Sequence, residues 1–111
     1  MQEVKNEIYK QLEELRQREM QNNELRQTME QMEEETYWQM RRAKEINDDL
    51  FEAYAKDKRL LELLAEKEDR LHKKQVSDRL FLEDMRDELR KQQMQIEDSK
   101  TACQIQLEQK E

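Results

Sequence analysis

Glycine and proline are both absent from this chain of 111 residues. The turns of a compact globular domain draw heavily on these two residues. Their absence, together with the abundance of Glu, Gln, Lys, Arg, Leu and Met, favours long helices or a coiled coil. Charged residues make up 44% of the chain and hydrophobic residues 34%, a balance that disordered chains share. The regular return of Leu, Ile and Met along the chain favours helix over disorder.

Cysteine and histidine are nearly absent. Cys103 is the only cysteine, which excludes an internal disulfide and is typical of a reducing cytosol. His72 is the only histidine and lies far from Cys103 in the sequence, so we expect neither a metal site nor a nucleophile with its base. A glycine-rich phosphate loop is excluded as well. The sequence therefore predicts no catalytic residue, no metal site and no cofactor, and we expect a protein that is not an enzyme.

A basic balance and long apolar runs are also lacking. The chain carries 21 Lys and Arg against 28 Asp and Glu, a net charge of −7, which disfavours binding to nucleic acid or to anionic membranes. A membrane-spanning helix needs about 20 consecutive apolar residues, and no run approaches this length. The N-terminus has no basic start followed by an apolar stretch, so no signal peptide is expected. These features predict a cytoplasmic protein without membrane insertion; export together with a partner is the alternative.

What the sequence does contain is a seven-residue repeat over residues 8–53. One column of the repeat is mainly apolar and the other is mixed, and together they predict one stripe on a helix that must pack against another helix. The first column is Ile8, Leu15, Asn22, Met29, Thr36, Ala43 and Leu50. The second is Gln11, Arg18, Leu25, Met32, Gln39, Ile46 and Ala53.

A second repeat follows, displaced by four residues from the first. Its columns are Leu61, Glu68, Gln75, Leu82, Leu89, Ile96 and Cys103, and Leu64, Leu71, Asp78, Met85, Gln92, Ser99 and Gln106. Such a displacement arises from a stutter in one continuous coiled coil or from a chain reversal in which Asp57 caps the second helix. The local sequence is compatible with both.

Chain reversal is our interpretation. It predicts a single all-α domain over residues 1–111, a long antiparallel two-helix hairpin that resembles a coiled coil. One arm covers about residues 2–54, the other about 60–109, and the bend lies near residues 54–60. Folding back at residue 57 pairs Met29 with Met85 and Leu25 with Leu89. The same register fails at the open end, where Arg18 faces Ile96.

Several apolar residues lie off both repeats and cluster within about 25 residues of the bend. A two-helix hairpin cannot bury two separate stripes on each arm, and surplus exposed apolar surface often marks a binding site. A homodimer or four-helix bundle would cover the same residues. We expect these residues to contact a partner: Trp38, Phe51, Tyr54, Leu60, Leu63 and Phe81.

Two charged, Gln-rich arms around an apolar middle, from Asn47-Asp48-Asp49-Leu50-Phe51 through Leu60-Leu61, resemble the small accessory proteins encoded beside LXG toxins in Gram-positive type VII secretion. The resemblance implies a helical adaptor or chaperone that binds the helical N-terminal domain of the toxin, alone or with a second small helical protein, and helps target it for export. Two hallmarks of the small secreted hairpins of that system are missing. Trp38 is followed by Gln39-Met40 instead of a Trp-x-Gly turn, and no tyrosine lies beyond Tyr54. This departure predicts an accessory that relies on another subunit's export signal.

The alternative is a structural protein. The same repeats would suit a homo-oligomeric coiled coil, or a helical hairpin similar to the stalk proteins of export machines. An adaptor would form a defined complex with a second protein, whereas a structural rod would assemble from copies of itself. The mass in solution separates these two hypotheses.

Overall fold

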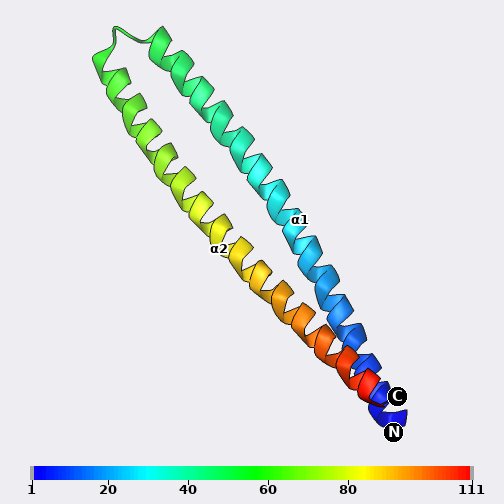
Figure 1. The fold of residues 1–111 in the computed structure, drawn as a ribbon. Helices are drawn as coiled ribbons and strands as arrows, with labels where there is room; N and C mark the ends of the chain where they lie inside the picture. Colours follow the sequence, from blue (N-terminus) through cyan, green and yellow to red (C-terminus); the bar gives the residue numbers. More distant parts are fainter. Residues whose placement is uncertain (1, 111) are drawn as a thin grey trace. The chain divides into compact units, whose positions relative to one another are not determined.

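The computed structural model describes residues 2–110 of the chain and the side chains of residues 2–109. It contains two helices, α1 (Gln2–Ala53) and α2 (Lys58–Lys110), joined by a short turn (Figure 1). Over these residues the backbone never leaves the helical conformation except at the turn, as expected where no glycine or proline interrupts strong helix formers. The predicted all-α helical hairpin is confirmed, and each helix begins and ends within two residues of the expected arm.

The turn shows why the chain reverses near residue 57. The amide of Tyr54 still donates to the carbonyl of Leu50 at 3.0 Å, and the amide of Asp57 donates to the carbonyl of Tyr54 at 2.9 Å. The Asp57 carboxylate then accepts a hydrogen bond from the amide of Leu60 at 3.1 Å. Asp57 is therefore the N-cap of α2, and its negative charge also suits the positive end of the helix dipole. Of the two readings of the four-residue displacement, chain reversal is confirmed.

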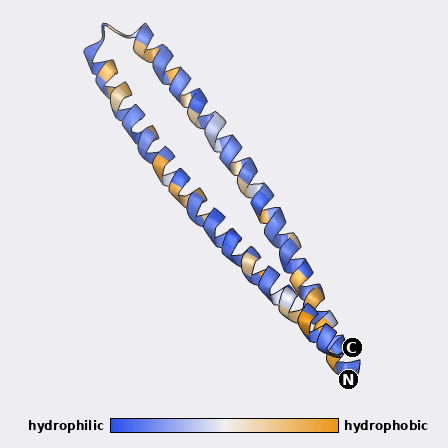
Figure 2. Ribbon diagram, viewed as in Figure 1, coloured by the Kyte–Doolittle hydropathy of each residue, from blue (hydrophilic) through white to orange (hydrophobic). Residues whose placement is uncertain are grey.

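Residue contacts divide the chain into two packed units. Unit 1 takes in the described part of Met1–Met29 and Met85–Glu111, and unit 2 is Glu30–Asp84, which includes the turn. Each unit consists of one stretch of α1 packed against one stretch of α2. Apolar positions are interrupted by polar ones along both helices (Figure 2).

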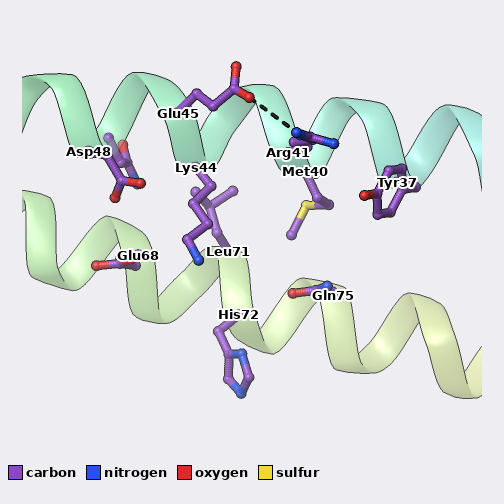
Figure 3. A pocket seen from close by; sticks show the side chains of 11 residues that line it. Tyr37, Met40, Arg41, Lys44, Glu45, Asp48, Glu68, Leu71, His72 and Gln75 are labelled. Atoms are coloured by element: carbon purple, nitrogen blue, oxygen red, sulfur yellow. Dashed lines mark hydrogen bonds and ion pairs between the residues drawn. The ribbon is translucent and has the colours of Figure 1, made fainter.

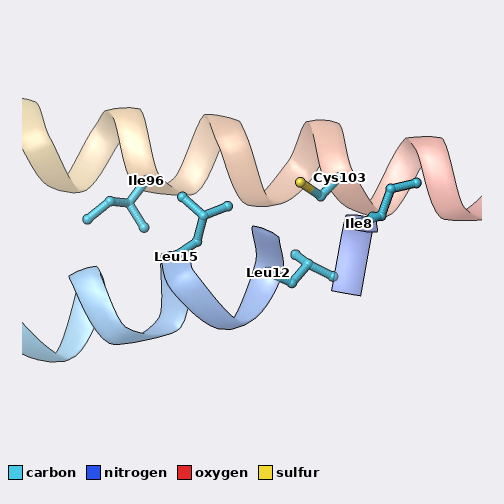
Figure 4. Packing of buried hydrophobic residues seen from close by; sticks show 5 residues of the cluster. All are labelled: Ile8, Leu12, Leu15, Ile96 and Cys103. Atoms are coloured by element: carbon cyan, nitrogen blue, oxygen red, sulfur yellow. The ribbon is translucent and has the colours of Figure 1, made fainter. Parts of the chain in front are cut away.

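Unit 1 contains a continuous apolar core. Its buried members are Ile8, Leu12, Leu15, Ile96 and Cys103, and Leu107 packs against them. In Figure 4, Leu15 points toward Ile96, while Ile8 and Leu12 lie beside Cys103. Polar contacts flank this core, among them the half-buried ion pair of Lys100 and Glu19, whose Nζ and Oε2 are 2.8 Å apart. The most completely packed part of the described chain therefore lies at the end farthest in sequence from the turn.

The register within unit 1 differs from the expected one by about one helical turn. The Asn22 side-chain amide donates to the carbonyl of Leu89 at 3.0 Å, whereas the sequence predicted Asn22 opposite Gln92. Leu25, expected to face Leu89, is 49% exposed. In the observed register Leu12 and Cys103 are buried in one apolar cluster, which favours this arrangement. Arg18, which the expected register placed in the seam, is exposed.

One of the two predicted columns of α1 is therefore correct and the other is wrong. The first column, from Ile8 to Leu50, is buried or half-buried throughout. The second column, from Gln11 to Ala53, is exposed. Its place is taken by the residues one position later, which are buried or half-buried: Leu12, Glu19, Arg26, Glu33, Met40 and Asn47.

In part of α2, too, the buried column lies one position later than the predicted column. The predicted companion column is half-buried at Leu64, Leu71, Asp78 and Met85. Beyond Met85 it is wrong: Gln92, Ser99 and Gln106 are exposed, and Gln93, Lys100 and Leu107 are half-buried in their place.

Candidate functional site

The candidate functional site is the exposed apolar and aromatic surface of unit 2. Among the described residues, every buried apolar side chain except Leu82 belongs to unit 1. Unit 2 instead exposes large apolar side chains on both helices: Met32, Tyr37, Trp38, Ile46, Tyr54, Leu63, Leu80 and Phe81. A hydrophobic core that is this thin, beside so much exposed apolar surface, is typical of a protein that is completed by a partner.

Trp38 is the centre of one cluster on this surface. It is 56% exposed, and its indole lies edge-on to the ring of Tyr37, with ring centroids 5.6 Å apart. The Arg41 guanidinium lies 5.7 Å from the indole centroid, a cation–π contact one helical turn away. Tyrosine, tryptophan and arginine are the residues most enriched at binding hot spots.

Arg41 is held in place from both directions along α1. Its Nε lies 3.4 Å from Oε1 of Glu45. A hydrogen bond with the Tyr37 side chain raises the pKa of Arg41 above its ordinary value, and the bond to Glu45 adds to this effect. The guanidinium is therefore charged at every physiological pH, and the Tyr37–Trp38–Arg41 cluster presents both an aromatic surface and a fixed positive charge.

Beside this cluster, an open hollow of about 480 Å³ lies between the two helices of unit 2 (Figure 3). Met40 and Leu71 point into the space between the helices, while His72 points away from α1 (Figure 3). The lining residues are Tyr37, Met40, Arg41, Lys44, Glu45, Asn47, Asp48, Glu68, Leu71, His72 and Gln75.

Asn47, on one wall of this hollow, is fully buried at 0% exposure. Neither its Nδ2 nor its Oδ1 has a hydrogen-bond partner. A buried amide in this state costs about 1–3 kcal/mol of stability. In the sequence, Asn47 stands out only as part of the stretch Asn47-Asp48-Asp49-Leu50-Phe51. Its burial follows from the column of α1 that replaced the expected one.

The six residues expected to contact a partner do not form a single surface. Leu60, Leu63 and Phe81 lie on one face of α2, because spacings of 3 and 18 residues bring side chains to nearly the same side of a helix. Leu60 is half-buried; Leu63 and Phe81 are exposed. These three can be contacted together by one partner helix.

The other three lie on α1 and at the turn. Phe51 is half-buried in the last turn of α1, and Tyr54 is exposed in the turn that follows it. Trp38 precedes Phe51 by thirteen residues, which places the two side chains about 140° apart around the helix axis. Trp38 therefore belongs with Tyr37 and Arg41 and is separate from the aromatic residues at the turn.

Among the described residues, no group of three or more His, Cys, Asp or Glu side chains is arranged to hold a metal ion. Neither helix, over the part that the structure describes, contains a stretch long and apolar enough to cross a membrane.

Comparison with known proteins gave no relative from which a function is transferred. No protein-family model, curated protein or solved structure matches this chain.

Proposed function

We propose that this chain is a non-enzymatic helical adaptor that binds a helical segment of another protein through unit 2. One observation carries the proposal: unit 1 contains a cluster of buried apolar side chains, whereas unit 2 buries only Leu82 among the described residues and exposes many of its large aromatic and aliphatic side chains. Covering apolar surface is the main favourable contribution to association. Partner helices laid along the separate faces of unit 2 would cover these side chains by the helix-in-groove mode of recognition.

The finer proposal is that the partner is the helical N-terminal domain of an LXG-type toxin and that the adaptor helps target it for type VII export. Its support is the layout of the sequence, two charged arms around the stretch from Asn47 to Leu61. The helical hairpin is the fold that this resemblance implies. In this proposal the chain acts in the cytoplasm and accompanies its partner to the export machine.

Co-expression with the helical N-terminal domain of an LXG toxin encoded beside the gene tests the proposal. We expect a complex of defined mass by light scattering, and a blue shift of the Trp38 fluorescence when the indole leaves water. The double variant Trp38→Ala/Phe81→Ala should lose the complex while it keeps the helix signal in circular dichroism. A complex that survives in this variant would show that unit 2 is not the binding surface.

Tyr9→Ala with Met20→Ala is a matched control. These residues are as exposed as Trp38 and Phe81, at 55% and 62%, but they belong to unit 1. The control variant should bind the toxin domain like the natural chain. Equal losses in both double variants would indicate that apolar surface anywhere on the chain contributes, which the adaptor proposal does not allow.

A structural homo-oligomer is the second candidate, and one observation favours it. Apolar side chains are exposed in unit 1 as well, among them Tyr9, Met20 and Met94, and copies packed along their whole length would cover them. In this case the purified chain alone would form a stable dimer or higher oligomer, with a cooperative unfolding transition that depends on concentration. A monomer that acquires defined mass only with a second protein would exclude it.

A further inference from the structure

One row of positions along α2 in unit 2 carries three cations and has no acidic member. Its members follow the spacing of a single helix face, and the face is called the basic stripe below. It consists of Leu60, Leu63, Lys67, Arg70, Lys74, Ser77 and Phe81. The stripe is about 32 Å long at 1.5 Å per residue, and its three cations fall within about 10 Å. Apolar residues stand at both ends of it.

The three cations of the stripe are exposed and, within the described chain, none of them makes an ion pair. Neighbouring cations on α2 behave differently. Lys73 pairs with Asp69 at 3.0 Å, and Arg59 pairs with Glu62 at 3.4 Å. The stripe is also opposed to the charge of its own surroundings, since unit 2 carries 11 Lys and Arg against 16 Asp and Glu, a net charge of −5.

The stripe faces the side of unit 2 opposite to the hollow of Figure 3. Glu68 and Gln75 line the hollow. Lys67 immediately precedes Glu68, and Lys74 immediately precedes Gln75. One residue is a rotation of about 100° around the helix axis, so the lysines and the hollow lie on opposite sides of the half-buried Leu71. The stripe therefore forms a surface separate from the Tyr37–Trp38–Arg41 cluster.

On α1, the corresponding side carries exposed apolar side chains. Tyr37 and Lys44 line the hollow, and the half-buried Met40 and Ala43 face α2. The column beyond these seam residues contains Met32 and Ile46, which are both exposed. This side of unit 2 thus combines a row of cations on α2 with apolar side chains on α1.

We propose that this side of unit 2 docks an acidic amphipathic helix of the partner protein. The proposal rests on the proposed adaptor function and specifies the chemistry of the partner. Leu63 and Phe81 would contact apolar residues at the two ends of the docked helix. Carboxylates spaced three or four residues apart would face the cations between them, whose aliphatic stems add apolar contact.

The charge of unit 2 favours an acidic helix over nucleic acid and over an anionic membrane as the partner of the stripe. Nucleic acids and anionic membranes also bind cations, but both present extended negative charge, and the net charge of −5 on unit 2 opposes them. A single helix presents its carboxylates only along one face. It can therefore face the stripe while it approaches fewer of the acidic side chains of unit 2 than an extended anionic surface would.

The test uses the full chain and three synthetic helical peptides of about 25 residues, roughly the length of the stripe. The peptides share one Leu-rich face and carry Glu, Gln or Lys beside it. We expect the Glu peptide to bind about tenfold more tightly than the Gln peptide, the size expected of three exposed ion pairs. The Lys peptide should not bind. The triple variant Lys67→Glu/Arg70→Glu/Lys74→Glu should reverse this order.

A matched control variant changes the net charge equally without touching the stripe. It is Lys58→Glu/Lys73→Glu/Arg79→Glu, and it should keep the preference for the Glu peptide. Circular dichroism of both variants checks that the helices persist. A control that reverses the preference as fully as the stripe variant would overturn the inference, because net charge alone would then account for it.

The remaining outcomes separate this inference from the proposed function. Equal affinity for the Glu and Gln peptides would overturn the role of the basic stripe while helix binding by unit 2 stands. Failure of all three peptides would overturn the inference and leave the adaptor function to the experiment with the toxin domain. The chain could instead bind duplex DNA or vesicles of anionic lipid, and the stripe variant could abolish this binding. That result would assign the stripe to one of those partners and would overturn the inference as well.

Discussion

Replacing Asn47 by leucine should make the protein more stable. Asn47 is completely buried in unit 2, and both of its side-chain polar atoms are without hydrogen-bond partners. Asparagine and leucine have similar shapes, so leucine would occupy the same space without the unpaired amide. Buried asparagine in a helical seam is known to fix register at a cost in stability.

The expected gain has three parts. Removing an unsatisfied buried amide contributes about 1–3 kcal/mol. Burying the leucine side chain contributes about 1.5–3 kcal/mol at most, less where the neighbouring hollow leaves part of it uncovered. Leucine also has a slightly better helix propensity, by a few tenths of a kcal/mol. We therefore expect Asn47→Leu to raise the free energy of unfolding by about 2–4 kcal/mol, a large fraction of the 5–15 kcal/mol typical of native proteins.

Urea unfolding followed by circular dichroism at 222 nm, roughly the wavelength of the helix minimum, measures this gain from the midpoint and slope. Asn22→Leu is the matched comparison, because Asn22 is also buried in the seam but its Nδ2 donates to the carbonyl of Leu89. That bond is lost in the variant, so its gain should be smaller by about 1 kcal/mol. A destabilised Asn47→Leu, or a gain no larger than that of Asn22→Leu, would refute the reasoning.

Three further predictions concern the packing. Ile96→Ala should lower the free energy of unfolding by about 2–4 kcal/mol because it opens a cavity in the core of unit 1. Replacing the exposed Leu25 by alanine should change the free energy of unfolding by less than about 0.5 kcal/mol. Equal effects of the two variants in urea unfolding would contradict the observed register. Asp57→Ala should cost about 1 kcal/mol through loss of the α2 N-cap, and an unchanged melting temperature would speak against the cap. Ile8→Cys should form a disulfide with Cys103 within one chain on mild oxidation, detected by mass spectrometry, and products joined only between chains would refute the pairing.

The sequence predicted the helices and the turn because both depend on local chemistry. The absence of glycine and proline leaves helix as the favourable backbone over either arm. The four-residue displacement of the repeat located the reversal, and Asp57 is one of the residues best suited to cap a helix. These signals lie within a few residues of the structures that they specify.

The register and one column of each arm were harder to predict. Leu25, Met32 and Ile46 made the wrong column of α1 look as apolar as the right one, which contains Glu19, Arg26 and Glu33. The choice depends on long-range packing in unit 1, where Leu12 is buried in one cluster with Cys103 and Leu107 packs against that cluster. The periodicity of one helix carries no information about which residues of the other helix face it.

In the candidate site, too, some features follow from the sequence pattern and others depend on the three-dimensional packing. Exposure of Trp38, Tyr54, Leu63 and Phe81 follows from their place off the repeat. The contact of Arg41 with the Trp38 ring and the unpaired amide of Asn47 depend on three-dimensional positions.

The uneven distribution of the core also sets an order in which the molecule opens. Amide protons exchange with solvent through local opening, and segments with few buried apolar contacts open at the lowest cost. Among the described residues, Leu82 is the only buried apolar side chain in the helical segments of unit 2. Deuterium should therefore enter the backbone near the turn long before it enters the stretch around Ile8 and Ile96, and a bound partner should slow its entry chiefly in unit 2.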